Sequence, residues 1–135
     1  MTADELARSY LAKAAVRAEM LEFLAQRQAW SDVVRVAQEL VELALKAMLR
    51  HVGIDPPKWH DVGGILLEHA ALFPADVRGQ LPELARISKR LRRDRELAFY
   101  GDIDFIPTRE YGPAEGQTAI DEARAVLEVA RQIVA

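Results

Sequence analysis

The feature that most constrains this chain is a helical repeat of apolar residues that returns in segment after segment. Apolar side chains recur every three or four residues, which places them on one face of an α-helix. β-Branched residues are scattered and never form the alternating runs typical of strands. In the first helical segment, about residues 4–26, the apolar face is Leu11, Ala14, Ala18, Leu21 and Ala25. The sequence therefore predicts an all-α fold.

Further helical segments follow, and glycine and proline separate them. Trp-Ser-Asp at residues 30–32 predicts the N-cap of a second helix through about residue 50, and Gly53 fits the turn that ends it. Asp61 fits the N-cap of a short helix reaching about residue 73. Two more long helices are expected, at about residues 82–100 and after a loop over residues 101–116. Four long helices and a short one predict an antiparallel up-and-down bundle.

Length and composition predict a single domain over residues 1–135. The net charge of −3 gives no global attraction to nucleic acid, so any contact with a polyanion requires a local patch. The absence of cysteine excludes disulfides and thiolate chemistry. No apolar run approaches the roughly 20 residues of a membrane span. We expect a cytoplasmic protein that does not engage a membrane.

Arg95 interrupts the apolar face of the helix expected at residues 82–100. A guanidinium withdrawn from water needs carboxylates, carbonyls or a ligand phosphate around it. Arg95 therefore indicates either a structural ion pair or an anion site. The other members of that face are Leu84, Ser88, Leu91 and Ala98.

A dense basic run surrounds this helix and allows two interpretations. In the first, residues 89, 92, 93 and 96 form one solvated face. In the second, Arg92 or Arg93 supports Arg95 in binding an RNA backbone or a nucleotide. Phe99 and Tyr100 would then stack on a base. The run consists of Lys89, Arg90, Arg92, Arg93 and Arg95.

The second helix carries a polar stripe at helical spacing, made of Arg35, Gln38 or Glu39, Glu42 and Lys46. Glu42 and Lys46 are four residues apart, the spacing of a common surface ion pair. Alternatively, Glu42 orients Arg95. The sequence leaves both roles open.

The three histidines, His51, His60 and His69, lack the spacing of a helical metal face. Since no cysteine is present to complete a zinc site, we expect no metal centre. No cofactor is indicated either. His60 lies next to Asp61, a carboxylate able to set its tautomer and charge. His60 is therefore either a catalytic acid or base, or the donor of a cap or loop hydrogen bond.

Together these residues resemble a HEPN domain, the higher eukaryote and prokaryote nucleotide-binding family, over nearly the whole chain. Residues 37–49 are similar to the signature helix of that family, and Gly53, Pro57 and residues 60–62 resemble the connector that follows it. Arg95 matches the arginine of the closing Arg-x(4–6)-His motif. The chain departs from the motif because no histidine follows Arg95, and Tyr100 occupies the place of the shortest-spaced one.

The resemblance implies a homodimer with the motif arginines near the two-fold axis. It also implies either a metal-independent endoribonuclease, often a toxin, or a non-catalytic role beside a small nucleotidyltransferase in a toxin–antitoxin-like module. RNA cleavage without metal needs a base and an acid, and a tyrosine with a pKa of about 10 is a poor base at neutral pH. We therefore expect a nucleotide- or substrate-binding partner of a nucleotidyltransferase, with little or no catalysis.

Two other functions remain open. One is an active ribonuclease in which Arg95 acts with His60 or Tyr100. The other is an interaction module that only dimerises, with Arg95 buried in an ion pair to Glu42 or Asp102. A nucleotidyltransferase partner could also adenylylate the hydroxyl of Tyr100.

Overall fold

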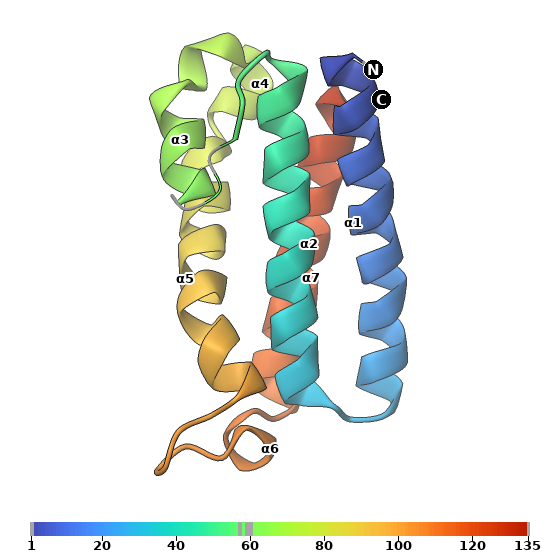
Figure 1. Cartoon of the computed structure of the whole chain (residues 1–135), viewed down its shortest axis with the longest axis vertical. Helices are drawn as coiled ribbons and strands as arrows, with labels where there is room; N and C mark the ends of the chain where they lie inside the picture. Colours follow the sequence, from blue (N-terminus) through green and yellow to red (C-terminus); the bar gives the residue numbers. More distant parts are fainter. Residues whose placement is uncertain (1, 57, 59–60, 135) are drawn as a thin grey trace.

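The computed structural model describes residues 2–56, 58 and 61–134. All secondary-structure elements named in these residues are helices. The long helices run alternately down and up, so consecutive ones are antiparallel (Figure 1). They are α1 (Ala3–Gln26), α2 (Trp30–His51), α5 (Leu81–Phe99) and α7 (Pro113–Ile133). The predicted all-α bundle is confirmed. None of the described helices is long and apolar enough to span a membrane.

Short helices connect the long ones in two places. Between α2 and α5 lie α3 (Val62–Glu68), a 3-10 turn (Ala70–Leu72) and α4 (Ala75–Arg78). The predicted short helix through residue 73 is therefore divided, and α4 was not expected. Pro74 separates the 3-10 turn from α4, since a proline cannot continue a helix that precedes it. Between α5 and α7 lies α6 (Pro107–Glu110).

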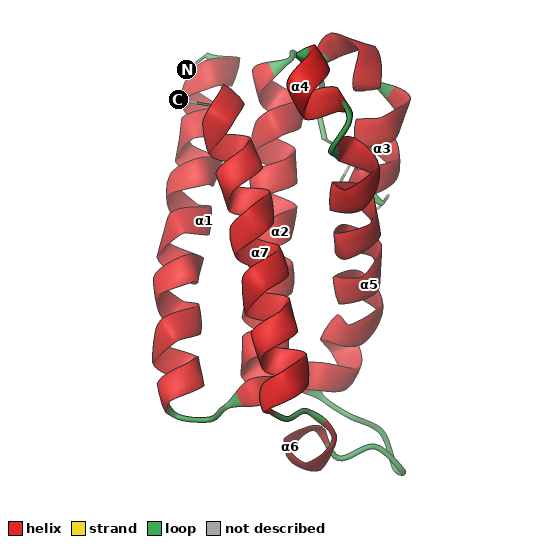
Figure 2. Cartoon of the chain, turned by 180° about the vertical axis from the view of Figure 1, so that it is seen from behind, coloured by secondary structure: helices red, strands yellow, loops and turns green. Residues whose placement is uncertain are grey.

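α2 is the central helix and packs against α1, α5 and α7. In Figure 2 α7 lies in front of α2, with α1 and α5 to either side. The polar stripe of α2 faces the space between α1 and α5: Arg35 lies over the ring of Phe99 on α5, and Glu39 pairs with Arg17 on α1. The apolar face predicted for α2 is buried, as Val34, Ala37, Val41, Ala44 and Met48 show. The stripe is thus the side of α2 that presents polar and charged side chains to its neighbours.

One predicted helix start is wrong and two predicted caps are confirmed. α2 begins at Trp30 without a side-chain cap, so residues 30–32 lie inside the helix. Packing fixes the N-terminal end of α2 instead. Gly116 of α7 lies so close to Trp30 that a Cβ on Gly116 would be 2.3 Å from Trp30 Cε3. Gly53 has the expected positive φ of 86° after α2. Asp61 caps α3 by accepting a hydrogen bond from the backbone N–H of residue 63 at 3.1 Å.

The segment after α5 is more ordered than the predicted loop over residues 101–116, because α6 and the first turn of α7 lie within it. Gly101 ends α5 as expected, with a φ of 73°. A β-bridge between Asp102 and Phe105 closes the next turn. The Phe105 and Tyr111 rings meet edge to face with centroids 5.6 Å apart. This segment projects beyond the end of the bundle, below α2 and α7 (Figure 1).

Candidate anion-binding pocket

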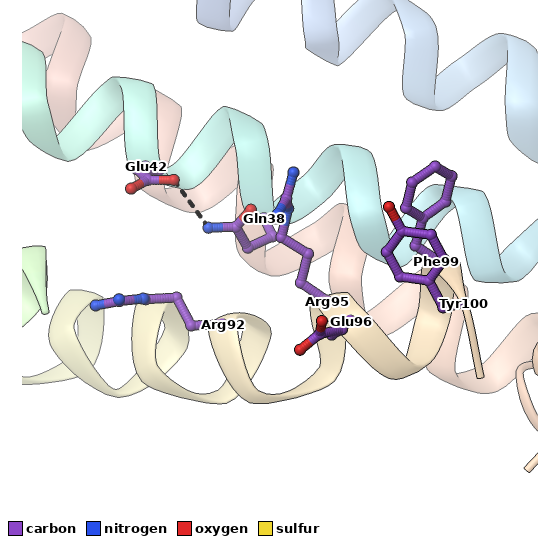
Figure 3. Close-up of a pocket in the computed structure, with 7 residues that line it drawn as sticks. All are labelled: Gln38, Glu42, Arg92, Arg95, Glu96, Phe99 and Tyr100. Carbon is purple, nitrogen blue, oxygen red and sulfur yellow. Dashed lines mark hydrogen bonds between the residues drawn. The ribbon is translucent and has the colours of Figure 1, made fainter. Parts of the chain in front are cut away.

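A pocket of about 320 Å³ lies between α2 and α5. Two of its residues come from α2, and the others come from the C-terminal half of α5 and its C-cap. Residues three or four apart on a helix share a face, which brings the α5 residues to one wall. The lining residues are Gln38, Glu42, Arg92, Arg95, Glu96, Phe99 and Tyr100 (Figure 3).

Arg95 is exposed, although its position in the helical repeat predicted burial. Its side chain extends from α5 toward α2 (Figure 3), and Gln38 of α2 lines the same pocket. It makes no hydrogen bond or ion pair with any other described residue. The predicted neighbours on the apolar face, Leu84, Ser88, Leu91 and Ala98, are buried.

Arg95 is exposed because of the surface that α5 meets at this point. Position 95 lies opposite the polar stripe of α2, where the pocket is open, rather than opposite an aliphatic side chain. The structural ion pair predicted for Arg95, with Glu42 or Asp102, is therefore wrong. An anion site at Arg95 is compatible with this geometry and stays a prediction.

Glu42 lines the pocket but contacts Gln38 and Lys46 rather than Arg95. Gln38 Nε2 donates to Glu42 Oε2 at 3.1 Å, and Lys46 Nζ lies 3.5 Å from Glu42 Oε1. The predicted Glu42–Lys46 pair is confirmed. Gln38 was one of two residues expected at its position on the polar stripe, one turn before Glu42, but no role in the site was predicted for it.

The basic run divides among three environments. Arg92 lines the pocket, and its Nη1 lies 3.7 Å from Oδ1 of Asp61, which is itself outside the pocket. Arg90 points to α7 and pairs with Glu122. Arg93 is exposed and does not line the pocket, since successive helical residues are about 100° apart around the axis. Of the two arginines expected to support Arg95, Arg92 lines the pocket and Arg93 does not.

The aromatic residues form one end of the pocket. The ring centroids of Phe99 and Tyr100 are 4.5 Å apart, and the planes are tilted by 49°. The Arg35 guanidinium lies over the Phe99 ring, 5.1 Å from its centroid, a cation–π geometry that occupies one face of that ring. Tyr100 is 73% exposed and presents the more open aromatic surface.

One other predicted site residue, Asp102, does not line the pocket. Asp102 is exposed, and its Oδ1 accepts a hydrogen bond from the backbone N–H of Ile103 at 2.7 Å. His60 lies outside the described residues. Within the described part of the chain, no three His, Cys, Asp or Glu side chains gather where they could hold a metal ion.

The family model for the HEPN domain matches residues 7–134, which is nearly the whole chain. No curated protein and no solved structure matches the chain. The matched range contains α2, α5 and α7, all of α1 from residue 7 onward, and every residue of the pocket. This protein belongs to the HEPN domain family.

Proposed function

We propose that the protein binds a nucleotide, or a nucleotide-bearing substrate, through the pocket between α2 and α5. In this proposal it is a cytoplasmic partner of a small nucleotidyltransferase in a toxin–antitoxin-like module, with little or no catalysis of its own. The observation that carries the proposal is the Arg95 guanidinium, which lies in an open pocket and is not paired with any described residue.

The pocket offers each kind of contact that a nucleotide requires. A guanidinium presents its N–H donors in a planar fork that matches phosphate oxygens, and Arg92 adds a second positive charge. The negative charge of Glu42 is offset by Lys46, so it opposes a phosphate less. The carboxylates of Glu42 and Glu96 can accept hydrogen bonds from sugar hydroxyls or base amino groups. Tyr100 offers a ring on which a base can stack.

Binding of AMP tests this proposal, and Arg95→Ala is the decisive variant. We expect isothermal titration calorimetry to show binding to the wild-type protein and at least about tenfold weaker binding to Arg95→Ala, because charge-assisted hydrogen bonds to phosphate are lost. Arg124→Ala is the matched control, since that arginine is exposed, pairs with Glu22 and lies outside the pocket. Circular dichroism should show that both variants fold. Equal affinity of the wild type and Arg95→Ala would contradict the proposal.

The partner proposals need separate measurements. Sedimentation analysis of the purified protein tests the homodimer, and co-purification with a co-expressed small nucleotidyltransferase tests the partnership.

The exposure of Tyr100 supports it as an adenylylation site. In that reaction its hydroxyl oxygen attacks the α-phosphorus of ATP and pyrophosphate leaves. We expect mass spectrometry to find one added AMP on wild-type protein incubated with partner and ATP, and none on Tyr100→Phe.

Metal-independent RNA cleavage is the second candidate, and the shared pocket of Arg95 and Tyr100 favours it. Arg95 can stabilise negative charge on a phosphorane-like transition state, and Tyr100 stands at the motif position of the missing histidine. The test is RNA cleavage by purified protein in the presence of a chelator. Cleavage that Arg95→Ala and Tyr100→Phe each abolish, with folding retained, would favour the ribonuclease. Intact RNA would leave nucleotide binding as the function of the pocket.

A further inference from the structure

Gln38 carries an oxygen atom that has no hydrogen-bond donor within the described part of the chain. The residue is only 4% exposed, and its Oε1 is buried without a partner. Most buried polar atoms in proteins are hydrogen-bonded, because an unpartnered one loses its contacts with water and gains nothing in return. Gln38 is one of the residues that line the candidate pocket.

Glu42 determines which way the Gln38 amide points. A carboxylate only accepts hydrogen bonds, so the amide nitrogen must face Glu42, and the 3.1 Å bond from Nε2 to Oε2 has this orientation. Turning the amide over would place its oxygen against the carboxylate oxygen. Lys46, with Nζ 3.5 Å from the other oxygen of Glu42, holds the carboxylate in turn. Oε1 of Gln38 is therefore held on the side away from Glu42.

Arg95 lacks the opposite kind of partner. Its guanidinium has several N–H donors, and none of the described residues provides an acceptor for them. Figure 3 shows its side chain passing the Gln38 amide on the side away from Glu42. An acceptor without a donor and a donor without an acceptor thus line the same pocket.

We propose that Gln38 is a positioning residue for Arg95. When an anion binds, Gln38 Oε1 accepts a hydrogen bond from one guanidinium N–H, and the remaining N–H groups face the phosphate. Lys46, Glu42, Gln38 and Arg95 then form a continuous polar chain across the pocket, which fixes the plane of the guanidinium. This inference rests on the proposed function of the pocket and gives Glu42 an indirect part in orienting Arg95.

A double-mutant cycle with AMP as the probe tests the inference. It uses the wild type, Gln38→Met, Arg95→Lys and the double variant. Methionine keeps a side chain of similar length without the oxygen, and lysine keeps the charge, so that binding stays measurable, but lacks the planar fork. We expect Gln38→Met to weaken AMP binding about fivefold in the wild-type background. In the Arg95→Lys background, we expect the same substitution to weaken it by less than about twofold.

Thermal unfolding without ligand separates positioning from a structural role. Gln38→Met removes the unpartnered oxygen but also the hydrogen bond from Nε2 to Glu42, so we expect an unfolding midpoint close to that of the wild type. Gln117→Met is the matched control, because Gln117 also donates its Nε2 to an acid four residues on, Asp121, at 2.9 Å, but is exposed and outside the pocket. We expect its AMP affinity to equal that of the wild type.

The possible outcomes are distinct. Equal weakening by Gln38→Met in both backgrounds, or no weakening in either, would overturn the positioning role. So would an unfolding midpoint of Gln38→Met so low that the variant is not folded under the binding conditions, since loss of structure would then explain the weaker binding. Wild-type binding that depends on Arg95 but not on Gln38 would overturn this inference and leave the proposed function standing. Absence of AMP binding by the wild type would overturn both.

Discussion

At the scale of single residues, the pocket is organised by which charges already have partners. Glu42 is paired with Lys46, Arg92 lies near Asp61, and Arg35 covers a face of Phe99. Arg95 is the pocket guanidinium for which the described residues supply no acceptor. In the proposed function, a ligand phosphate would therefore meet a charged partner that need not break an existing bond.

Tyr111, which anchors the segment after α5, predicts a measurable pH dependence. Its hydroxyl donates to the backbone carbonyl of Asp94 at 3.4 Å, and burial, helped by the negative charge of Asp94, raises the pKa of Tyr111. Its contribution to stability is therefore complete below the ordinary tyrosine pKa of about 10. As pH rises from there through the raised pKa, the unfolded chain loses the proton more readily and the free energy of unfolding falls.

Tyr111→Phe keeps the ring against Phe105 and removes the titrating group. We expect urea denaturation from about pH 8 to about pH 11 to show a shallower loss of stability in this variant than in the wild type. Parallel pH profiles would show that Tyr111 has the same pKa in the folded and unfolded chain.

At the scale of elements, the contact between α3 and α5 places Asp61 near Arg92. Gly63, in the first turn of α3, approaches α5 so closely that a Cβ would lie 2.8 Å from Cα of Ala85. Backbone cannot move aside as a flexible side chain can. The absence of a side chain at Gly63 thus allows α3 to sit where its N-cap, Asp61, reaches the basic side of α5.

Adjacent glycines in α3 allow a matched test of this contact. We expect Gly63→Ala to lower the free energy of unfolding by about 1–3 kcal/mol, because α3 must move away from α5. A Cβ on Gly64 would have only Asp61 Oδ2 nearby, at 3.9 Å. Gly64→Ala should therefore stabilise by about 0.4–1 kcal/mol through reduced freedom of the unfolded chain. Similar effects of the two substitutions in chemical denaturation would contradict the close contact.

At the scale of the whole molecule, α2 joins the bundle, and α5 and α7 contact each other much less than either contacts α2. Ion pairs supply part of the link between α5 and α7. Glu122 of α7 accepts hydrogen bonds from Arg86, at 2.9 Å, and from Arg90, both on α5. Its side chain is 16% exposed, so solvent screens these pairs less than it screens a fully exposed pair.

Glu122→Gln tests this link between helices. We expect it to lower the free energy of unfolding by about 1–2 kcal/mol, since two arginines lose their shared counter-charge. Glu22→Gln is the control, because its pair with Arg124 joins α1 and α7 across exposed side chains and should contribute less than about 0.5 kcal/mol. Urea denaturation at low and high salt measures the free energy of unfolding of both variants. We expect added salt to reduce the difference in this free energy between Glu122→Gln and the wild type. Equal losses would show that burial of Glu122 does not strengthen its pairs.

The sequence by itself determined the helical class, the long helices and several of their ends. These features depend on residue spacing and on local backbone preferences, as Gly53, Asp61 and Gly101 illustrate. It also identified five of the pocket residues, because the family motif and the basic and aromatic clusters are local patterns. They are Glu42, Arg92, Arg95, Phe99 and Tyr100.

Only the tertiary structure decided which side of each helix is covered. Arg95 shares a helical face with buried residues, yet it is exposed because α2 presents its polar stripe there. The same packing leaves Arg93 in solvent and buries Gln38. Periodicity describes one helix at a time, whereas burial depends on where the neighbouring helices lie. The partners of Arg95 could therefore not be read from the spacing along its own helix.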